Sequence, residues 1–321
     1  MRIALTGAGG FVGINLTRRL AADGHEVLAV DRAFSQRSMA ALPTGVTTRE
    51  VDVLDAGTLQ EALAAFQPQA LFHGATLTAD AARETAAFSS ILDVNVVGTG
   101  RVLEAARAAG AARVVVASSS AVYGEAVFED APREDDRPSP TTLYGITKLA
   151  AEQAALRFAS IHGVDVRVAR IAAVFGPYEH RSGARDAMSP LFQLAASALA
   201  GEPAVLPQGG ARDWIAAPRV ADVLASLLTA RSLDHAVYNV AAARTWTPDL
   251  LAQRLDDAKP GWSWSHGDRP TIDYRDDLTR RRFALDTTRL RSSFGEAAAG
   301  DVGVDAEDYV RWVRANPDWF T

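Results

Sequence analysis

Short apolar runs alternate with amphipathic segments along most of the chain. The first two runs cover residues 2–5 and 26–30, and the segment between them predicts an amphipathic helix that ends near residue 22. The fifth and sixth runs cover residues 114–117 and 164–171. Six strands that alternate with helices are typical of an α/β fold with a doubly wound parallel sheet, in which ligands bind at the carboxyl ends of the strands.

A glycine-rich turn follows the first apolar run. Gly7, Gly10 and Gly13 are spaced G-x-x-G-x-x-G between that strand and the helix. Glycines let the backbone approach a ligand closely, and a helix N-terminus offers unpaired N–H groups to a pyrophosphate. A strand, glycine turn, helix and second strand within about 30 residues therefore predict a dinucleotide site on a Rossmann-type sheet.

Asp31 ends the second strand. Its carboxylate can accept hydrogen bonds from both hydroxyls of an adenosine ribose, and its charge would repel a 2′-phosphate. The expected cofactor is therefore NAD rather than NADP, although the neighbouring Arg32 weakens that preference.

Tyr144 and Lys148 lie one turn apart on a predicted helix, so their side chains share one face. A phenol normally ionises near pH ~10, and a nearby ammonium lowers its pKa toward the range where proton transfer is efficient. The pair therefore suits the oxidation of an alcohol, and the alternative is an ordinary surface helix. The chain has 33 Lys plus Arg, but its only lysines are Lys148 and Lys259, which favours a specific role for Lys148.

Composition excludes several classes of protein. A net charge of −6 and a pI of 5.6 give no basis for binding nucleic acid or anionic membranes. The chain has no cysteine, so thiolate metal sites are excluded, and we expect no metal. No apolar run approaches the ~20 residues that span a bilayer. We expect a cytoplasmic enzyme with a small-molecule substrate.

The sequence T-G-x-x-G-F-x-G at the first turn resembles the extended branch of the short-chain dehydrogenase/reductase family, and the resemblance continues along nearly the whole chain. It implies an NAD-binding Rossmann lobe and a smaller, mixed C-terminal substrate lobe. The corresponding ranges are 1–171 plus about 213–241, and about 172–212 plus 242–321. The expected cofactor contacts are Gly7, Gly10, Phe11, Val12, Gly13, Asp31, Arg32, Asp52, Val53, His73, Ala75, Asn95, Tyr144 and Lys148.

The resemblance also implies the catalytic residues. The active-site hydroxyl of the family lies four residues before a tyrosine that corresponds to Tyr123, which identifies Ser119, with Ser118 and Ser120 as alternatives. Ser119 would orient the substrate oxygen while Tyr144 exchanges its proton, and Lys148 would lower the tyrosine pKa and bind the nicotinamide ribose. The expected substrate contacts are Thr76, Ser119, Ser120, Ala173, Arg212 and Arg269.

The net reaction stays open between alternatives. Dehydration is disfavoured, because Ser120 and Ala121 replace the Asp-Glu pair of the dehydratases. Arg212 and Arg269 resemble positions that bind a nucleotide diphosphate, which slightly favours a nucleotide-sugar epimerase. Ala173 stands where such enzymes commonly have asparagine, so a net dehydrogenase of a sugar or sugar acid, of the D-erythronate dehydrogenase kind, is the close alternative. A non-catalytic NAD-sensing protein is a third.

The resemblance further implies a homodimer. Family members commonly pair through two helices, and the alanine-rich segments 103–109 and 150–156 would allow close helix approach.

Overall fold

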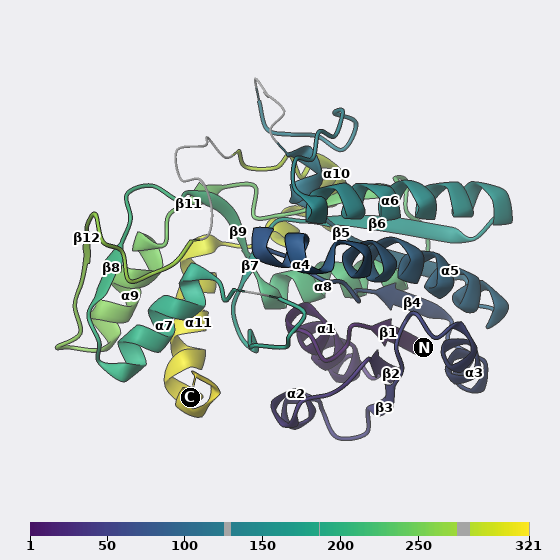
Figure 1. Ribbon diagram of the computed structural model, residues 1–321, viewed down its shortest axis with the longest axis horizontal. Coiled ribbons are helices and arrows are strands. Elements are labelled where there is room, and N and C mark those ends of the chain that lie inside the picture. The colour runs from purple at the N-terminus through teal and green to yellow at the C-terminus, as the bar shows by residue number, and fades with distance from the viewer. Residues whose placement is uncertain (125–129, 186, 275–282, 321) are drawn as a thin grey trace.

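A seven-stranded parallel sheet forms the centre of the larger part of the molecule (Figure 1). The computed structural model describes residues 1–124, 130–185, 187–274 and 283–320. The strand order is β3-β2-β1-β4-β5-β6-β10, and every neighbouring pair is parallel. The strands are β1 (Arg2–Thr6), β2 (Glu26–Asp31), β3 (Thr47–Glu50), β4 (Ala70–His73), β5 (Arg113–Ser119), β6 (Asp165–Ile171) and β10 (Val237–Val240).

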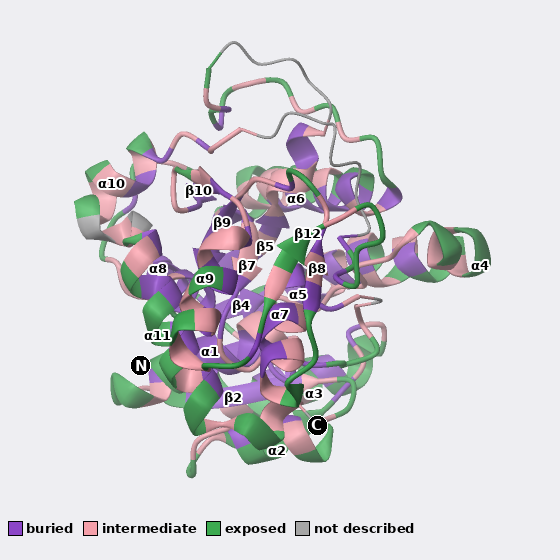
Figure 2. Ribbon diagram, turned by 90° about the vertical axis from the view of Figure 1, so that its left-hand side faces the viewer, coloured by how far each residue is buried: buried purple, intermediate pink, exposed green. Residues whose placement is uncertain are grey.

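Helices cover both faces of this sheet. The helical segments of this part of the molecule are α1 (Phe11–Ala22), α2 (Gln36–Ala41), α3 (Ala56–Phe66), α4 (Ala81–Leu92), the π-helix η1 (Asp93–Val97), α5 (Gly98–Ala108), the 3-10 helix η2 (Ser120–Tyr123), α6 (Leu143–His162) and α8 (Ala217–Thr229). Ile3 and Leu5 of β1 pack toward α1 and α8, whereas Ala4 packs toward α3 and α5. Because both faces are covered, the central strands β1, β2 and β4 are almost continuously apolar, and Figure 2 shows buried residues along strands of the sheet. None of the described helices is long and apolar enough to cross a membrane.

The strand order reverses beside β1. The chain proceeds outward through β2 and β3 and then returns to the other side of β1 as β4. Doubly wound sheets bind ligands in the crevice that such a reversal opens at the carboxyl ends of the strands. The glycine turn after β1 and the loop after β4 both lie there. The Rossmann-type fold predicted from the sequence is confirmed.

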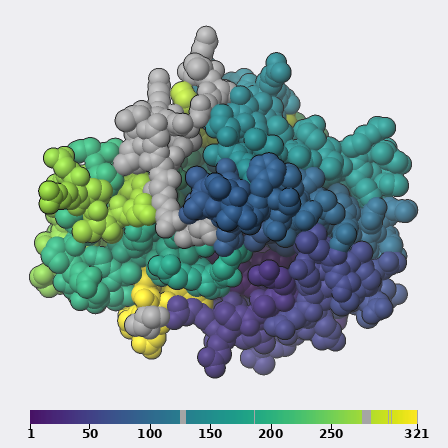
Figure 3. Space-filling view, in the orientation of Figure 1, coloured from purple at the N-terminus to yellow at the C-terminus, as the bar shows by residue number. Residues whose placement is uncertain are grey.

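Two small sheets and most of the remaining helices form the second part, on the left of Figure 1. One sheet is mixed, because β9 pairs with β7 in parallel and with β11 antiparallel. Phe175, Trp214 and Tyr309 are buried in the core of this part. Figure 3 shows yellow-green segments of this part on the left and the purple N-terminal segments at the lower right, with the yellow C-terminal segment beside the latter. The elements are β7 (Ala173–Phe175), α7 (Pro190–Ala200), β8 (Ala204–Leu206), β9 (Arg212–Ala216), β11 (Thr245–Trp246), α9 (Asp249–Ala258), β12 (Trp264–His266), α11 (Val302–Ala315) and η4 (Pro317–Phe320). The late segments α10 (Thr288–Phe294) and η3 (Glu296–Ala299) instead pack on the large part, because Leu290 and Phe294 of α10 join the core that contains Ile3 and Leu5.

The chain passes between the large and small sheets three times between residues 171 and 245. β6 ends at Ile171 and β7 begins at Ala173, β9 leads directly into α8, and β10 leads to β11. β9 lies in the small mixed sheet, although the predicted lobe boundary near residue 213 assigns most of it to the first lobe. The division into residue ranges stays a prediction.

Candidate active site

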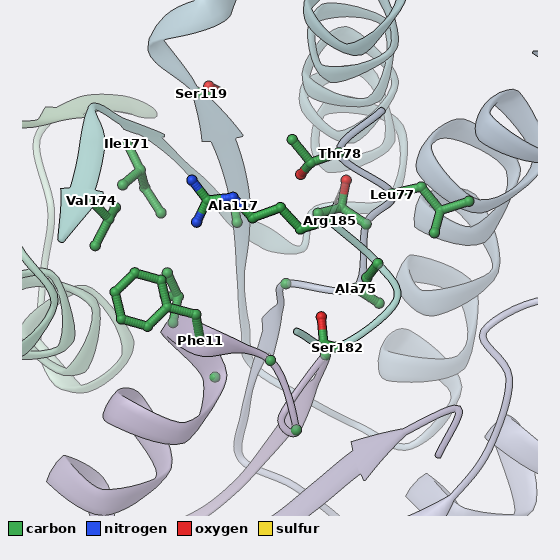
Figure 4. A pocket seen from close by; sticks show the side chains of 18 of the residues that line it. Phe11, Ala75, Leu77, Thr78, Ala117, Ser119, Ile171, Val174, Ser182 and Arg185 are labelled. Carbon is green, nitrogen blue, oxygen red and sulfur yellow. The ribbon is translucent and has the colours of Figure 1, made fainter. Parts of the chain in front are cut away.

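A cleft of about 560 Å³ opens at the carboxyl ends of the large sheet and extends to the small sheets (Figure 4). Most of the site residues predicted from the sequence line it. These are Gly7, Gly10, Phe11, Val12, Gly13, Asp31, Arg32, Asp52, Val53, Ala75, Thr76, Ser119, Tyr144, Lys148, Ala173 and Arg212.

The glycine turn leaves no room for side chains. A Cβ atom on Gly7, whose φ is +73°, would lie 2.6 Å from the backbone nitrogen of Ala75. A Cβ atom on Gly13 would lie 2.1 Å from the carbonyl oxygen of Gly7. Gly10 is the N-cap of α1, and no side chain caps this helix. The N–H groups of the first helical turn therefore remain for a ligand, and the turn fits a dinucleotide pyrophosphate.

Asp31 is fixed beside this turn. Its Oδ2 accepts a hydrogen bond from the backbone N–H of Gly9 at 2.9 Å, and its Oδ1 accepts one from the N–H of Arg32 at 2.7 Å. Burial raises the pKa of Asp31, and these backbone donors partly oppose the rise. The carboxylate therefore lies at the end of β2, where the ribose of a bound dinucleotide is expected.

Tyr144 lies in the first turn of α6, which begins after the N-cap Thr142. Its side chain lines the cleft together with those of Ser119 and Thr78. Burial raises the pKa of the phenol, whereas the hydroxyls of Ser119 and Thr78, which favour the phenolate, and the charge of Arg185 lower it. The positive charge that favours the phenolate therefore comes from Arg185 in this structure, whereas the sequence assigned that role to Lys148.

Lys148 is buried one turn after Tyr144. Burial lowers the pKa of its ammonium to about 8, and the charge of Glu152, one turn further on, partly opposes this. Glu152 is fully buried and is paired with Arg170 at 2.6 Å. It also accepts a hydrogen bond from Ser118 at 3.0 Å. This buried network connects the end of β5 to the helix that carries Tyr144 and Lys148.

Ser119 is the serine of this strand end that meets the tyrosine. It is the last residue of β5 and lines the cleft, and its Oγ accepts a hydrogen bond from the backbone N–H of Ala121 at 3.1 Å. Ser118 is bound to Glu152, and Ser120 begins η2 and does not line the cleft. A hydroxyl, a phenol and an ammonium beside a dinucleotide turn can move a proton to or from an alcohol.

Comparison with known proteins identifies the family. The model described as the NAD dependent epimerase/dehydratase family matches residues 3–241. The chain belongs to this family. The dTDP-L-rhamnose 4-epimerase of Burkholderia thailandensis is 30% identical over 268 residues, which are 71% of this chain and 72% of that enzyme. The resemblance to extended short-chain dehydrogenases/reductases is thereby confirmed, as is NAD as the cofactor of the family.

Solved structures of similar proteins agree with this assignment. The UDP-glucose 4-epimerase of Thermus thermophilus in complex with NAD has a TM-score of 0.82 and 25% identity, covering 98% of this chain and 99% of that one. MoeE5 in complex with UDP-glucose and NAD has a TM-score of 0.77 and 28% identity, covering 99% and 100%. MoeE5 has also been solved with UDP-glucuronic acid and NAD, and that structure has a TM-score of 0.76.

His73 does not reach the cleft of this NAD-dependent family member. The imidazole is buried, with Nδ1 2.7 Å from Thr6 Oγ1 and Nε2 3.0 Å from Thr99 Oγ1. Thr99 donates its own proton to the carbonyl of Asn95, so Nε2 must donate to Thr99 and Nδ1 must accept from Thr6. Burial and then the charge of Lys148 lower the pKa of His73 to about 3, so the ring is neutral. The imidazole is therefore occupied by side chains of the protein rather than directed at the cofactor.

Asn95 also lies outside the lining of the cleft. Its Oδ1 accepts hydrogen bonds from Thr76 Oγ1 and from the N–H of Leu77, and its Nδ2 donates to the carbonyl of Leu77 and to Thr147. These contacts fill the hydrogen-bonding capacity of a primary amide. Asn95, in the π-helix η1, therefore ties the cleft-lining loop at residues 76–77 to α6.

Arg269 is exposed and does not line the cleft, so the structure separates it from Arg212. Conversely, Arg185, Thr78 and Tyr274 line the cleft although the sequence did not single them out. Arg185 lies in a polar stretch with the composition of a surface loop. Nothing in the sequence of this stretch distinguishes Arg185 from the exposed Arg181.

Proposed function

We propose that this protein is a nucleotide-sugar epimerase that uses NAD to oxidise a secondary hydroxyl of its substrate. The observation that carries the proposal is that Ser119, at the end of β5, and Tyr144 and Lys148, on α6, line the same cleft as the glycine turn. The relatives named above are epimerases or bind nucleotide sugars, which supports a substrate of this class.

The chain supplies the proton chemistry. Tyr144 accepts the proton of the reacting hydroxyl, and Ser119 holds the oxygen of that hydroxyl in place. Lys148, charged below its pKa of about 8, would hold the nicotinamide ribose of the cofactor through its ammonium. The glycine turn and Asp31 hold NAD, which supplies the hydride acceptor when bound.

Arg212 is proposed to bind the diphosphate of the substrate. It lines the cleft from β9, on the side of the small sheets, and its guanidinium lies 5.6 Å from the ring centre of Trp214. An arginine fork matches the geometry of phosphate oxygens.

A net dehydrogenase of a sugar acid remains the second candidate, and two observations favour it. Ala173 lines the cleft and offers no hydrogen bond to a nucleotide, and Arg269 contributes no second cation there. In such an enzyme the product would leave the site oxidised and NADH would accumulate.

A thermal-shift titration with UDP in the presence of NAD tests the proposal. UDP is expected to raise the melting temperature of the wild type and of Arg269→Met, the matched control outside the cleft, but not of Arg212→Met. Absence of a shift in the wild type would count against a nucleotide-sugar substrate. Free sugar acids would then be screened for NADH production, which is the result expected of the dehydrogenase.

We further propose that the protein forms a homodimer in the cytoplasm. Ile146 on α6 and Val97 beside α5 are large apolar side chains that are 46% and 45% exposed. Ala150 and Ala154, at successive turns after Ile146, are also exposed and would let a second copy of α6 approach closely. Light scattering should give twice the monomer mass, and Ile146→Asp should reduce it to the monomer mass.

A further inference from the structure

The segment at residues 178–185, here called the strap, crosses the cleft. It begins shortly after β7 and reaches the wall formed by the loop after β4. There the N–H of Thr78 donates to the carbonyl of Ala184 at 2.9 Å, and Arg83 donates to the carbonyl of Gly183 at 2.9 Å. The strap is therefore attached to both parts of the molecule, and its last residue is placed over the site.

The side chain of Arg185 extends from the strap into the cleft. Figure 4 shows it reaching from the side of Thr78 toward Ile171 and Val174. The side chain is 34% exposed, and its charge acts on the phenol of Tyr144. The guanidinium therefore lies beside the position at which the reacting carbon of a substrate must sit.

Glu179, also on the strap, fixes the direction of this guanidinium. Its carboxylate is buried and accepts hydrogen bonds from both the N–H and the Oγ of Ser189, each at 2.6 Å. The same carboxylate pairs with Nη1 of Arg185 at 2.9 Å. Among the described residues, this is the side-chain partner of Arg185, and the rest of the guanidinium is left for a ligand in the cleft. Glu179 is thus a positioning residue.

We propose that Arg185 binds a carboxylate carried by the sugar of the substrate, close to the reacting carbon. The inference rests on the proposed function, because it takes Tyr144 as the group that meets the reacting hydroxyl. A guanidinium matches a carboxylate with two parallel hydrogen bonds. The diphosphate of a nucleotide sugar is assigned to Arg212, so the anion near Arg185 belongs to the sugar itself. The substrate class is a uronate, either linked to a nucleotide or as a free sugar acid.

Two pairs of ligands that differ only in a carboxylate test this inference. They are UDP-glucuronate against UDP-glucose and galacturonate against galactose, with binding measured by thermal shift and calorimetry in the presence of NAD and turnover measured separately. The variants are Arg185→Met and Arg181→Met, the latter an exposed control on the same strap that does not line the cleft.

The wild type and Arg181→Met are expected to bind one of the two acids more tightly than its neutral counterpart. In Arg185→Met this preference should fall by about 10- to 100-fold, as for a lost hydrogen bond to a charged group, with binding of the neutral ligand unchanged. Glu179→Gln should reduce the same preference by a smaller factor. If the role of Glu179 were purely structural, Glu179→Gln would instead bind the acid and the neutral ligand more weakly by the same factor.

The outcomes separate the two proposals. Preference for galacturonate without binding of either nucleotide sugar supports the carboxylate site and overturns the nucleotide-sugar epimerase. The carboxylate site is overturned if the wild type binds UDP-glucose and UDP-glucuronate equally, or if Arg185→Met loses the same affinity for both. Either result is still consistent with a nucleotide-sugar epimerase. Failure of the wild type to bind either acid also overturns the carboxylate site.

Discussion

Replacing Lys148 by methionine should stabilise the cofactor-free protein while removing its function. Methionine is close to lysine in length but carries no charge, so the variant removes the buried ammonium and retains an apolar stem. Burial lowers the pKa of Lys148 from 10.5 to about 8. One pKa unit corresponds to about 1.4 kcal/mol, so keeping this lysine charged at pH 7 costs the folded state about 3 kcal/mol. The expected gain in unfolding free energy is of that order.

The same pKa shift predicts a pH dependence with a definite sign. Between pH 8 and 10.5 the folded state has released the proton of Lys148 while the unfolded state still holds it. The unfolding free energy of the wild type therefore rises with pH across this window relative to that of Lys148→Met. Below pH 8 the folded wild type carries the whole free-energy cost of the buried, charged Lys148. Urea denaturation of both proteins at several pH values from 7 to 10.5 measures the difference.

Lys259, the other lysine, provides a matched control. Its ammonium donates hydrogen bonds to the carbonyls of Ala198 and Leu199 at the end of α7. Lys259→Met should therefore lower the unfolding free energy by about 1 to 2 kcal/mol. A Lys148→Met protein that is less stable than the wild type at pH 7, or a pH dependence equal to that of the wild type, would refute the reasoning about burial.

Three further predictions concern the cleft. Tyr144→Phe should abolish turnover while NAD affinity, measured by calorimetry, stays within a few-fold of wild type, and retained turnover would remove Tyr144 from its proposed role. Gly13→Ala should lower the unfolding free energy by about 1 to 3 kcal/mol in urea, because its Cβ would overlap the Gly7 carbonyl; an unchanged midpoint would contradict this. Asp31→Asn should weaken NAD binding about tenfold or more and narrow the preference for NAD over NADP, since it removes a charged hydrogen-bond acceptor; unaltered affinities for both would be the contrary result.

The sequence predicts the large sheet well because its signals are local. Continuous apolar runs mark strands that are covered on both faces, and the glycine turn specifies the strand-to-helix connection. The spacing of Tyr144 and Lys148 places both on one helical face, and parallel strands end at one edge, so Ser119 arrives beside them.

The remaining site residues depend on contacts that spacing does not encode. His73 follows a strand that ends at the cleft, yet Thr6 and Thr99, distant in sequence, hold its imidazole inside the protein. Arg269 and Arg185 both lie in polar segments of similar composition. The pairing of Thr78 with the strap and the ion pair between Arg185 and Glu179 direct Arg185 inward. Long-range pairing of loops therefore decides which arginines reach the substrate.

The repeated passage of the chain between the large and small sheets has a consequence for evolution and engineering. Because the segments of the small sheets are inserted between β6, α8 and β10, neither part is a continuous stretch that could be excised or exchanged as a cassette. A new specificity is reached instead by substituting short segments such as the strap within a retained framework. A single cut by a protease in a connecting segment would likewise leave the two parts joined through the other connections.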